Sequence, residues 1–158
     1  MKEIVYIETT VVSLLVSEPS RDLIIAGNQQ ATRDWWEHRS GSFLCVTSDE
    51  TLTESARGDV ELARRRLAAL KSLPVVPIGS ESADLAAEFL RTGALPPRAK
   101  SDAIHLAVAT ISGADYLLTW NCRHLANAQI LRRLEREAVR FGWKLPTVCT
   151  PPELMGEW

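Results

Sequence analysis

The stretch AKSDAIHLAVATISGADYLLTWN, residues 99–121, indicates the class of fold. Residues 99–111 are apolar nearly all the way round a helix, which is typical of a helix buried on every side. Residues 116–120 form a short apolar run, typical of a buried strand, that ends at Asn121. We therefore expect a central helix and a strand packed in layers around one core.

Four other short apolar runs are predicted strands: residues 4–7, 43–46, 75–78 and 147–149. Helical patterns fill the intervals between them. Ser20 and Ser80 are expected to cap two of these helices, and residues 128–141 are strongly amphipathic. Strands that alternate with helices predict right-handed crossovers and a parallel sheet covered on both faces.

The composition fits one globular domain and excludes several classes of protein. The 158 residues are 46% hydrophobic and 24% charged, which is enough for a single core. A net charge of −2 excludes a polybasic tail and an acidic solvating protein. Of the 18 basic residues 14 are arginines, whose planar guanidinium group suits phosphate, so arginine usage points mildly to nucleic acid.

The cysteines and the apolar runs predict where the protein works. Cys45, Cys122 and Cys149 are odd in number and no signal peptide precedes them, which predicts a reduced, cytoplasmic protein. No apolar run approaches the roughly 18 residues that a membrane span needs. We therefore expect no membrane contact.

Residue spacing argues against several types of enzyme. The eight glycines are too dispersed for a dinucleotide fingerprint or a P-loop. No serine lies in a nucleophile-elbow pattern, and the three histidines lack the helical spacing of a metal-binding pair. Cys122 and His124 have no second pair of ligands at a suitable spacing, which argues against zinc.

Four oxygen-bearing side chains follow predicted strands or lie in the next helix: Glu8, Glu54, Asp102 and Asn121. Each also has a structural explanation, as a helix-start acid, a solvated helical acid, a helix cap or ion pair, and a turn residue. Asp102 is the most informative, because a carboxylate entering so apolar a helix costs several kcal/mol unless it is paired, hydrogen-bonded or bound to metal.

These positions converge on one crevice, because the carboxyl ends of parallel strands lie at the same edge of a sheet. Three carboxylates in one crevice repel each other unless a cation joins them, and all-oxygen ligation favours Mg²⁺ or Mn²⁺. Such a cation can bind a phosphodiester and activate water. We expect Glu8, Glu54 and Asp102 to hold the metal, Asn121 to complete or border the catalytic site, and Thr9 and Thr119 to be supporting or helix-capping hydroxyls.

Four blocks of sequence together resemble the PIN-domain family, in particular the prokaryotic nucleases related to the VapC toxins of toxin–antitoxin systems. They are residues 5–10 (VYIETT), Glu54 after the second strand, residues 101–107 (SDAIHLA), and residues 116–121 (YLLTWN) followed by His124. The order and spacing of these blocks along most of the chain carry the resemblance.

The resemblance implies a single PIN-like domain over residues 1–158, with an α/β fold of the three-layer sandwich type, in which helices flank a mostly parallel central sheet. It also implies a Mg²⁺- or Mn²⁺-dependent ribonuclease with an RNA substrate, a homodimer, and an antitoxin protein that inhibits toxin members. Two residues depart from the family pattern, since Glu8 replaces the usual Asp and Asn121 stands where Asp is common. The longer Glu8 suits Mn²⁺ better than Mg²⁺, and the neutral Asn121 favours one metal over two.

Two other functions stay open. The first is a catalytically weak or inactive module of this fold that binds RNA or a protein partner without cutting. The second is a metal-dependent phosphatase on a similar sheet. Loss of metal-dependent RNA cleavage in Asp102→Asn would separate the nuclease from both.

Several residues near these blocks have competing interpretations. Trp35 and Trp36 fit either a dimer or antitoxin surface or the core. His105 shares the helical face of Asp102, as a partner of a metal ligand or as a core histidine. Trp120 is expected to be buried against the central helix.

Overall fold

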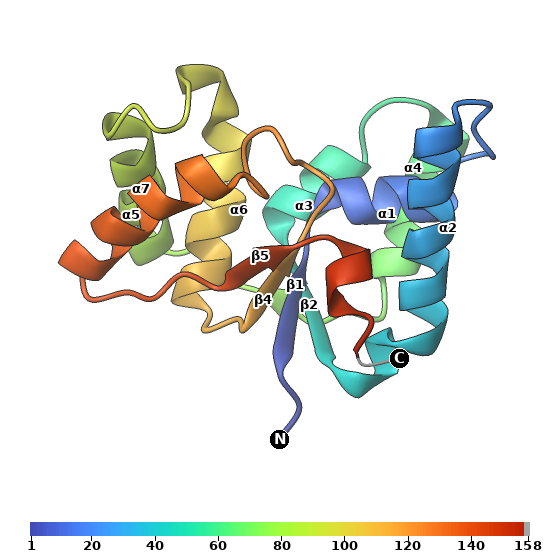
Figure 1. Cartoon of the computed structure of the whole chain (residues 1–158), viewed down its shortest axis with the longest axis horizontal. Helices are drawn as coiled ribbons and strands as arrows, with labels where there is room; N and C mark the ends of the chain where they lie inside the picture. Colours follow the sequence, from blue (N-terminus) through green and yellow to red (C-terminus); the bar gives the residue numbers. More distant parts are fainter. Residues whose placement is uncertain (157–158) are drawn as a thin grey trace.

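The computed structural model describes residues 1–156 as a five-stranded parallel sheet between two groups of helices (Figure 1). The order across the sheet is β3-β2-β1-β4-β5, and every neighbouring pair is parallel. The strands are β1 (Ile4–Ile7), β2 (Leu44–Ser48), β3 (Val75–Val76), β4 (Tyr116–Leu118) and β5 (Thr147–Cys149). The parallel α/β fold expected from the sequence is confirmed.

Seven α-helices connect or follow the strands within the described residues. They are α1 (Thr9–Val16), α2 (Leu23–His38), α3 (Asp49–Ser55), α4 (Val60–Leu70), α5 (Ser80–Arg91), α6 (Lys100–Ile111) and α7 (Ala128–Arg140). Three short 3₁₀ turns lie at Ser40–Ser42, Pro97–Ala99 and Pro151–Leu154. No helix among residues 1–156 combines the length and the apolar character that crossing a membrane requires.

Two helices begin differently from the sequence prediction. Asp22, not Ser20, is the N-cap of α2, because its carboxylate accepts the main-chain N–H groups of Ile24 and Ile25. Gly79 occupies the N-cap of α5, so Ser80 is the first helical residue. The prediction placed a serine hydroxyl at the start of each helix. In the structure the N-cap is instead a carboxylate in α2 and a glycine in α5.

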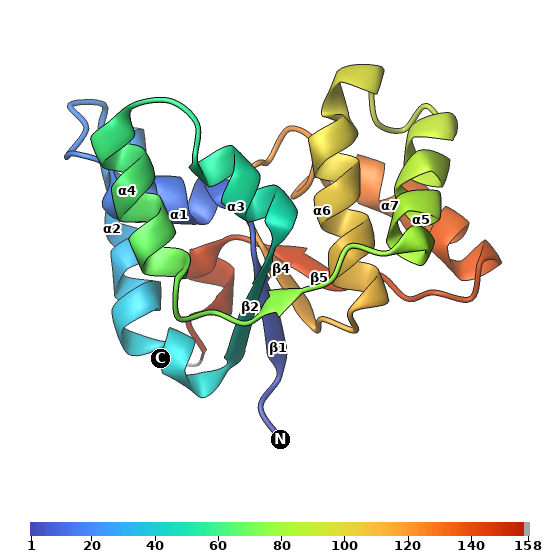
Figure 2. The same ribbon diagram turned by 180° about the vertical axis from the view of Figure 1, so that it is seen from behind.

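Strand residues alternate between two hydrophobic cores. Tyr6 and Leu117 point to the core shared with α5, α6 and α7. Val5, Ile7 and Leu118 point to the opposite core, which contains residues of α1, α2 and α4. The two views in Figures 1 and 2 show these two groups of helices on opposite sides of the sheet. This alternation is the period of two expected of a strand.

This packing decides between the two interpretations of Trp35 and places Trp120 differently from expectation. Trp35 is fully buried and donates its Nε1–H to the Leu154 carbonyl, so it is core and not a docking surface. Trp120 was expected against the central helix α6, and this prediction is wrong. Side chains two residues apart in an extended chain point to the same side, so Trp120 follows Leu118 to the core of α1 and α2. Trp120 packs there and stays half-exposed.

The ends of the strands also differ from prediction. β2 continues to Ser48, because Thr47 and Ser48 pair with Val75 and Val76 of β3. β4 ends at Leu118, before the predicted residue 120, because the main-chain N–H of Trp120 donates to the Thr10 hydroxyl and not to a neighbouring strand. The chain therefore leaves the sheet directly above its carboxyl edge.

The order of the strands reverses direction at β1. From β1 the chain moves to β2 and β3 on one side, and β4 and β5 fill the other side. Such a switch point separates the loops that leave the two central strands and opens a crevice between them. The residues after β1 and β4 border this crevice, which is where the sequence placed Glu8 and Asn121.

We expect Leu117→Ala to destabilise the protein strongly, because Leu117 is fully buried in a central strand. The loss in unfolding free energy should be about 3 kcal/mol, the usual cost of such a cavity. Urea denaturation followed by circular dichroism measures it. Val139→Ala is the control, since Val139 is 70% exposed and should change stability by less than about 0.5 kcal/mol. Equal effects of the two substitutions would contradict the core assignment.

Candidate functional site

Glu8 is a buried carboxylate at the end of β1. Its side chain is the N-cap of α1, so the helix-start role given as its structural alternative is confirmed. Oε2 accepts the main-chain N–H and the hydroxyl of Thr10, and the hydroxyl of Thr119 at 2.7 Å. These three donors offset the cost of burying the charge. Within residues 1–156, Oε1 has no hydrogen-bond partner.

Glu54 approaches Glu8 from the last turn of the short helix α3. Its Oε1 accepts the Thr9 hydroxyl at 2.7 Å and is hydrogen-bonded to His105 Nε2. Burial raises the pKa of Glu54, but the hydrogen bond and positive charge of His105 and the bond from Thr9 outweigh it, so this pKa lies below its ordinary value. The nearby Ser101 hydroxyl also lowers this pKa; that hydroxyl donates to Glu50 at 2.5 Å, and among the described residues no hydrogen bond reaches Oε2 of Glu54.

His105 supports Glu54 from the centre of α6. The imidazole is fully buried, and its Nδ1 lies 2.7 Å from the hydroxyl of Tyr6, which in turn lies 2.6 Å from the Ser48 hydroxyl. Burial lowers the pKa of His105, but the Tyr6 oxygen and the hydrogen bond to Glu54 raise it by more. The pKa of His105 is therefore well above its ordinary value. A positively charged His105 donates from both nitrogens and pairs with an ionised Glu54.

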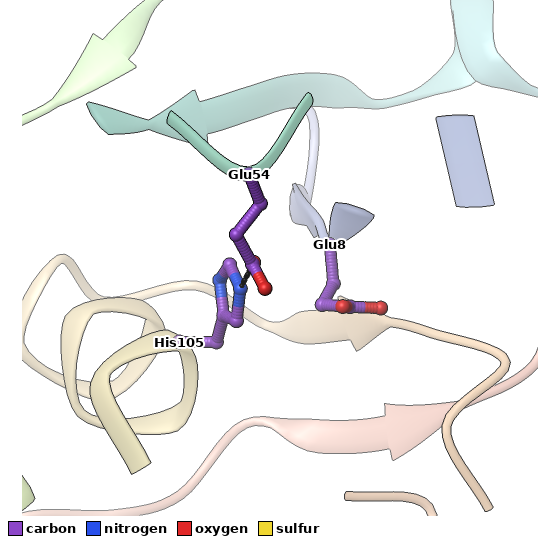
Figure 3. A group of neighbouring side chains, drawn as sticks. All are labelled: Glu8, Glu54 and His105. Carbon is purple, nitrogen blue, oxygen red and sulfur yellow. Dashed lines mark hydrogen bonds and ion pairs between the residues drawn. The ribbon is translucent and has the colours of Figure 1, made fainter. Parts of the chain in front are cut away.

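Glu8, Glu54 and His105 form the tightest group of metal-ligating atoms among the described residues. One ligand atom from each lies within 4.8 Å of the other two. In Figure 3 a dashed line joins Glu54 to His105, and Glu54 stands between the histidine and Glu8 in this view. Because both nitrogens of His105 are already bonded, the histidine holds Glu54 in place and the carboxylates face the open space.

Asp102 lies outside this tight group but lines the same cavity. It occupies the first turn of α6, and its side chain is 17% exposed. Oδ1 accepts the Asn121 amide at 3.1 Å, and Oδ2 lies 2.9 Å from His124 Nδ1. A carboxylate has about four acceptor positions, so one bond to each oxygen leaves room for a cation.

Asn121 uses its whole amide inside the protein. Nδ2 donates to Asp102, while Oδ1 accepts the main-chain N–H groups of Arg123 and His124 at 3.2 and 3.0 Å. This is the turn predicted as its structural alternative. Asn121 therefore borders the crevice and orients Asp102, and its oxygen is not free to bind a metal in this conformation.

The cavity that joins these groups measures about 490 Å³. Its polar lining includes Glu8, Thr9, Glu54, Asp102 and Asn121, so five of the predicted site residues share one space. Thr119 supports Glu8 from behind. Carboxylate oxygens are the ligands that Mg²⁺ and Mn²⁺ prefer, so the donor set fits a hard divalent cation.

Three residues that hold the acids were not singled out as site residues from the sequence. Thr10 donates to Glu8, His124 contacts Asp102, and Tyr6 contacts His105. Tyr6 carried a signal, because a tyrosine in a fully buried strand needs a partner for its hydroxyl. For His124 the sequence held no signal beyond its place after Asn121, because the conformation of a loop sets the orientation of its side chain.

Comparison with known proteins identifies the family. The family model described as PIN domain matches residues 5–130, which is most of the chain. The chain belongs to the PIN domain family. This PIN domain also resembles a chain in the crystal structure of VapBC2 from Rickettsia felis bound to a DNA fragment from their promoter.

The similarity to that chain is structural. The TM-score is 0.60 at 13% sequence identity, and the match covers 93% of this chain and 98% of the other. At this identity the match supports the fold and not the activity. A search of curated proteins finds no match.

The pair of Glu54 and His105 predicts a window of pH stability, in metal-free buffer with EDTA. The contribution of Glu54 to the free energy of unfolding is present above the ordinary pKa of 4.5, and it is lost as the pH falls through the lowered pKa of the folded state. The part due to His105 is complete below its ordinary pKa of 6.5 and is lost as the pH rises through its raised folded pKa. The free energy of unfolding should thus differ most between wild type and Glu54→Gln from pH 4.5 to 6.5.

Urea denaturation of the two proteins across and beyond this window measures that difference. Glu88→Gln is the matched control, because Glu88 is a half-buried partner of Arg91 and pairs with no histidine among the described residues. A difference between wild type and Glu54→Gln that stays constant with pH would show that the two groups are not ion-paired.

Proposed function

We propose that this PIN domain is a divalent-metal-dependent endoribonuclease. The observation that carries the proposal is that Glu8, Glu54 and Asp102 line one open cavity, with ligand atoms of Glu8 and Glu54 within 4.8 Å of each other. Here each glutamate is held by one oxygen and presents the other.

In this proposal Glu8, Glu54 and Asp102 hold one Mg²⁺ or Mn²⁺. When bound, such an ion would act as a Lewis acid that lowers the pKa of a water molecule and stabilises the leaving oxygen of a phosphodiester. Glu54 stays ionised because His105 and Thr9 stabilise its charge. A carboxylate of the cavity accepts the proton that the attacking water loses.

Neighbouring cations make RNA the preferred substrate over a small phosphate ester. Arg98 and Lys100 are exposed just before Asp102, and Arg123 is exposed just after Asn121. Being close in sequence to Asp102 and Asn121, these cations are candidates to contact phosphates next to the one that is cut. A single small ester would use none of them.

We further propose that the protein is the toxin of a toxin–antitoxin pair, works in the cytoplasm and forms a homodimer. The structural likeness to a chain of VapBC2 supports an antitoxin partner. Exposed apolar side chains support a protein interface, since Leu23 and Ile24 at the start of α2 are 87% and 77% exposed and Val60 at the start of α4 is 85% exposed.

A second candidate is a module of the same fold that binds RNA or a protein but cuts weakly. It is favoured by Asn121, whose oxygen is occupied by two main-chain N–H groups and adds no negative charge. In that case the site would hold a metal without supporting hydrolysis. The same experiment separates the two candidates.

We expect purified protein to cleave RNA in Mn²⁺ or Mg²⁺ and not in EDTA. Asp102→Asn should lower the rate by at least about 100-fold, because even residues that only orient metal ligands cost 10–100-fold. The assay uses a mixture of structured and single-stranded RNA with separation on a denaturing gel. Asp84→Asn is the matched control, since Asp84 is exposed on α5 and lines a different pocket.

Each other result has a defined meaning. Metal-dependent cleavage that survives Asp102→Asn would overturn the site assignment or reveal a contaminant. No cleavage under any condition would favour the binding module. Cleavage of a small phosphate ester with no action on RNA would indicate a phosphatase.

A further inference from the structure

The cavity at the acids continues to a second, less polar wall. Trp120, Leu14 and Asn28 line it, from the loop after β4 and from α1 and α2. None of these three residues has a part in holding the metal. The volume of about 490 Å³ lies in the range of pockets that enclose small ligands or one unit of a polymer.

Trp120 is fixed at two points. Its indole Nε1–H donates to the Thr32 hydroxyl at 2.8 Å, and its main-chain N–H donates to the Thr10 hydroxyl at 2.8 Å. Thr32 is itself fully buried and donates to the Asn28 carbonyl at 2.6 Å. The indole therefore has a set orientation while the residue remains half-exposed beside the cavity.

The same Thr10 hydroxyl also donates to Glu8. One side chain thus connects the aromatic wall of the cavity to a proposed metal ligand. The ring and the carboxylate are held in a fixed relation, as a site would require if it bound two adjoining parts of one substrate.

Asn28 adds a hydrogen-bonding group to this wall. Its side chain is half-buried and lines the cavity, and within residues 1–156 its amide has no hydrogen-bond partner. An amide offers a carbonyl acceptor and an NH₂ donor, the groups that read the edge of a base.

Comparison with Trp35 shows that Trp120 is not simply a core residue. Trp35 is fully buried and packs against Trp36 and Phe43. Trp120 borders an open space next to charged groups, where contact of its aromatic surface with water does not stabilise the protein.

We propose that Trp120 is a stacking platform for one unpaired nucleobase of single-stranded RNA, with the Asn28 amide at the edge of that base. The inference rests on the proposed nuclease function and adds a subsite for the nucleotide whose phosphate reaches the carboxylates. Bases in single strands stack on aromatic side chains and expose their edges, whereas paired bases cannot enter such a pocket.

The test measures binding separately from cleavage, in the Asp102→Asn background with Mg²⁺. The probes are a labelled oligoadenylate and a strand of equal length that carries the same ribose-phosphate backbone without bases. Fluorescence anisotropy gives the two dissociation constants. Adding Trp120→Leu should weaken binding of the oligoadenylate about 10-fold and leave the abasic strand unchanged.

Two further variants separate stacking from a structural role. Trp120→Phe keeps an aromatic face but loses the bond to Thr32, as Trp120→Leu does, so it should retain most of the base-dependent binding. Asn28→Ala should weaken binding of the oligoadenylate about 5-fold and spare the abasic strand. Trp36→Leu, on α2 about two turns beyond Asn28, is the matched tryptophan control and should change neither.

The outcomes distinguish this inference from the proposed function. If wild type cleaves RNA but Trp120→Leu binds the two strands as before, the inference fails and the nuclease stands. If wild type cleaves nothing but Trp120→Leu selectively loses the oligoadenylate, the subsite stands and the nuclease fails. Equal weakening by Trp120→Leu and Trp120→Phe, or equal weakening for both strands, would show a structural role and overturn the inference.

Discussion

Electrostatic repulsion between carboxylates at the carboxyl edge of β1 and β4 is the constraint on which the rest of the site depends. Glu8 is only 3% exposed, so protein groups must supply most of its hydrogen bonds. The protein supplies separate donors to each acid, from the threonines around Glu8, from His105 behind Glu54, and from the loop after β4 beside Asp102. The acids can therefore lie side by side and keep lone pairs directed at the cavity.

Those donors lie on different elements, so their positions depend on the packing of helices against both faces of the sheet. His105 is placed by the core that α6 shares with α5 and α7. The hydroxyl of Thr10 is placed by α1, which packs on the opposite face. The site thus lies at the boundary of the two cores, where small movements of either group of helices change the distances between the acids.

The sequence was sufficient for the fold because its signals are local. Apolar runs and their alternation with helical patterns predicted five strands in the positions found, within a few residues at each end. The crevice followed from the rule for parallel strands, and Glu8, Glu54, Asp102 and Asn121 do line one cavity. The partners of these acids were harder to predict, because a loop orients His124 and strand parity, not apolar character, decides the side on which Trp120 packs.

The Thr10 hydroxyl joins the beginning of the chain to a loop that follows more than a hundred residues later, where it meets the main chain of Trp120. During translation Glu8 is synthesised early, but the hydrogen bond that it accepts from Thr119 cannot form until the residues of β4 and Thr119 have been added. At about 5–20 residues per second, several seconds of synthesis separate the two events. An incomplete chain therefore cannot assemble the crevice, whose two sides meet only after the loop that follows β4 has been made.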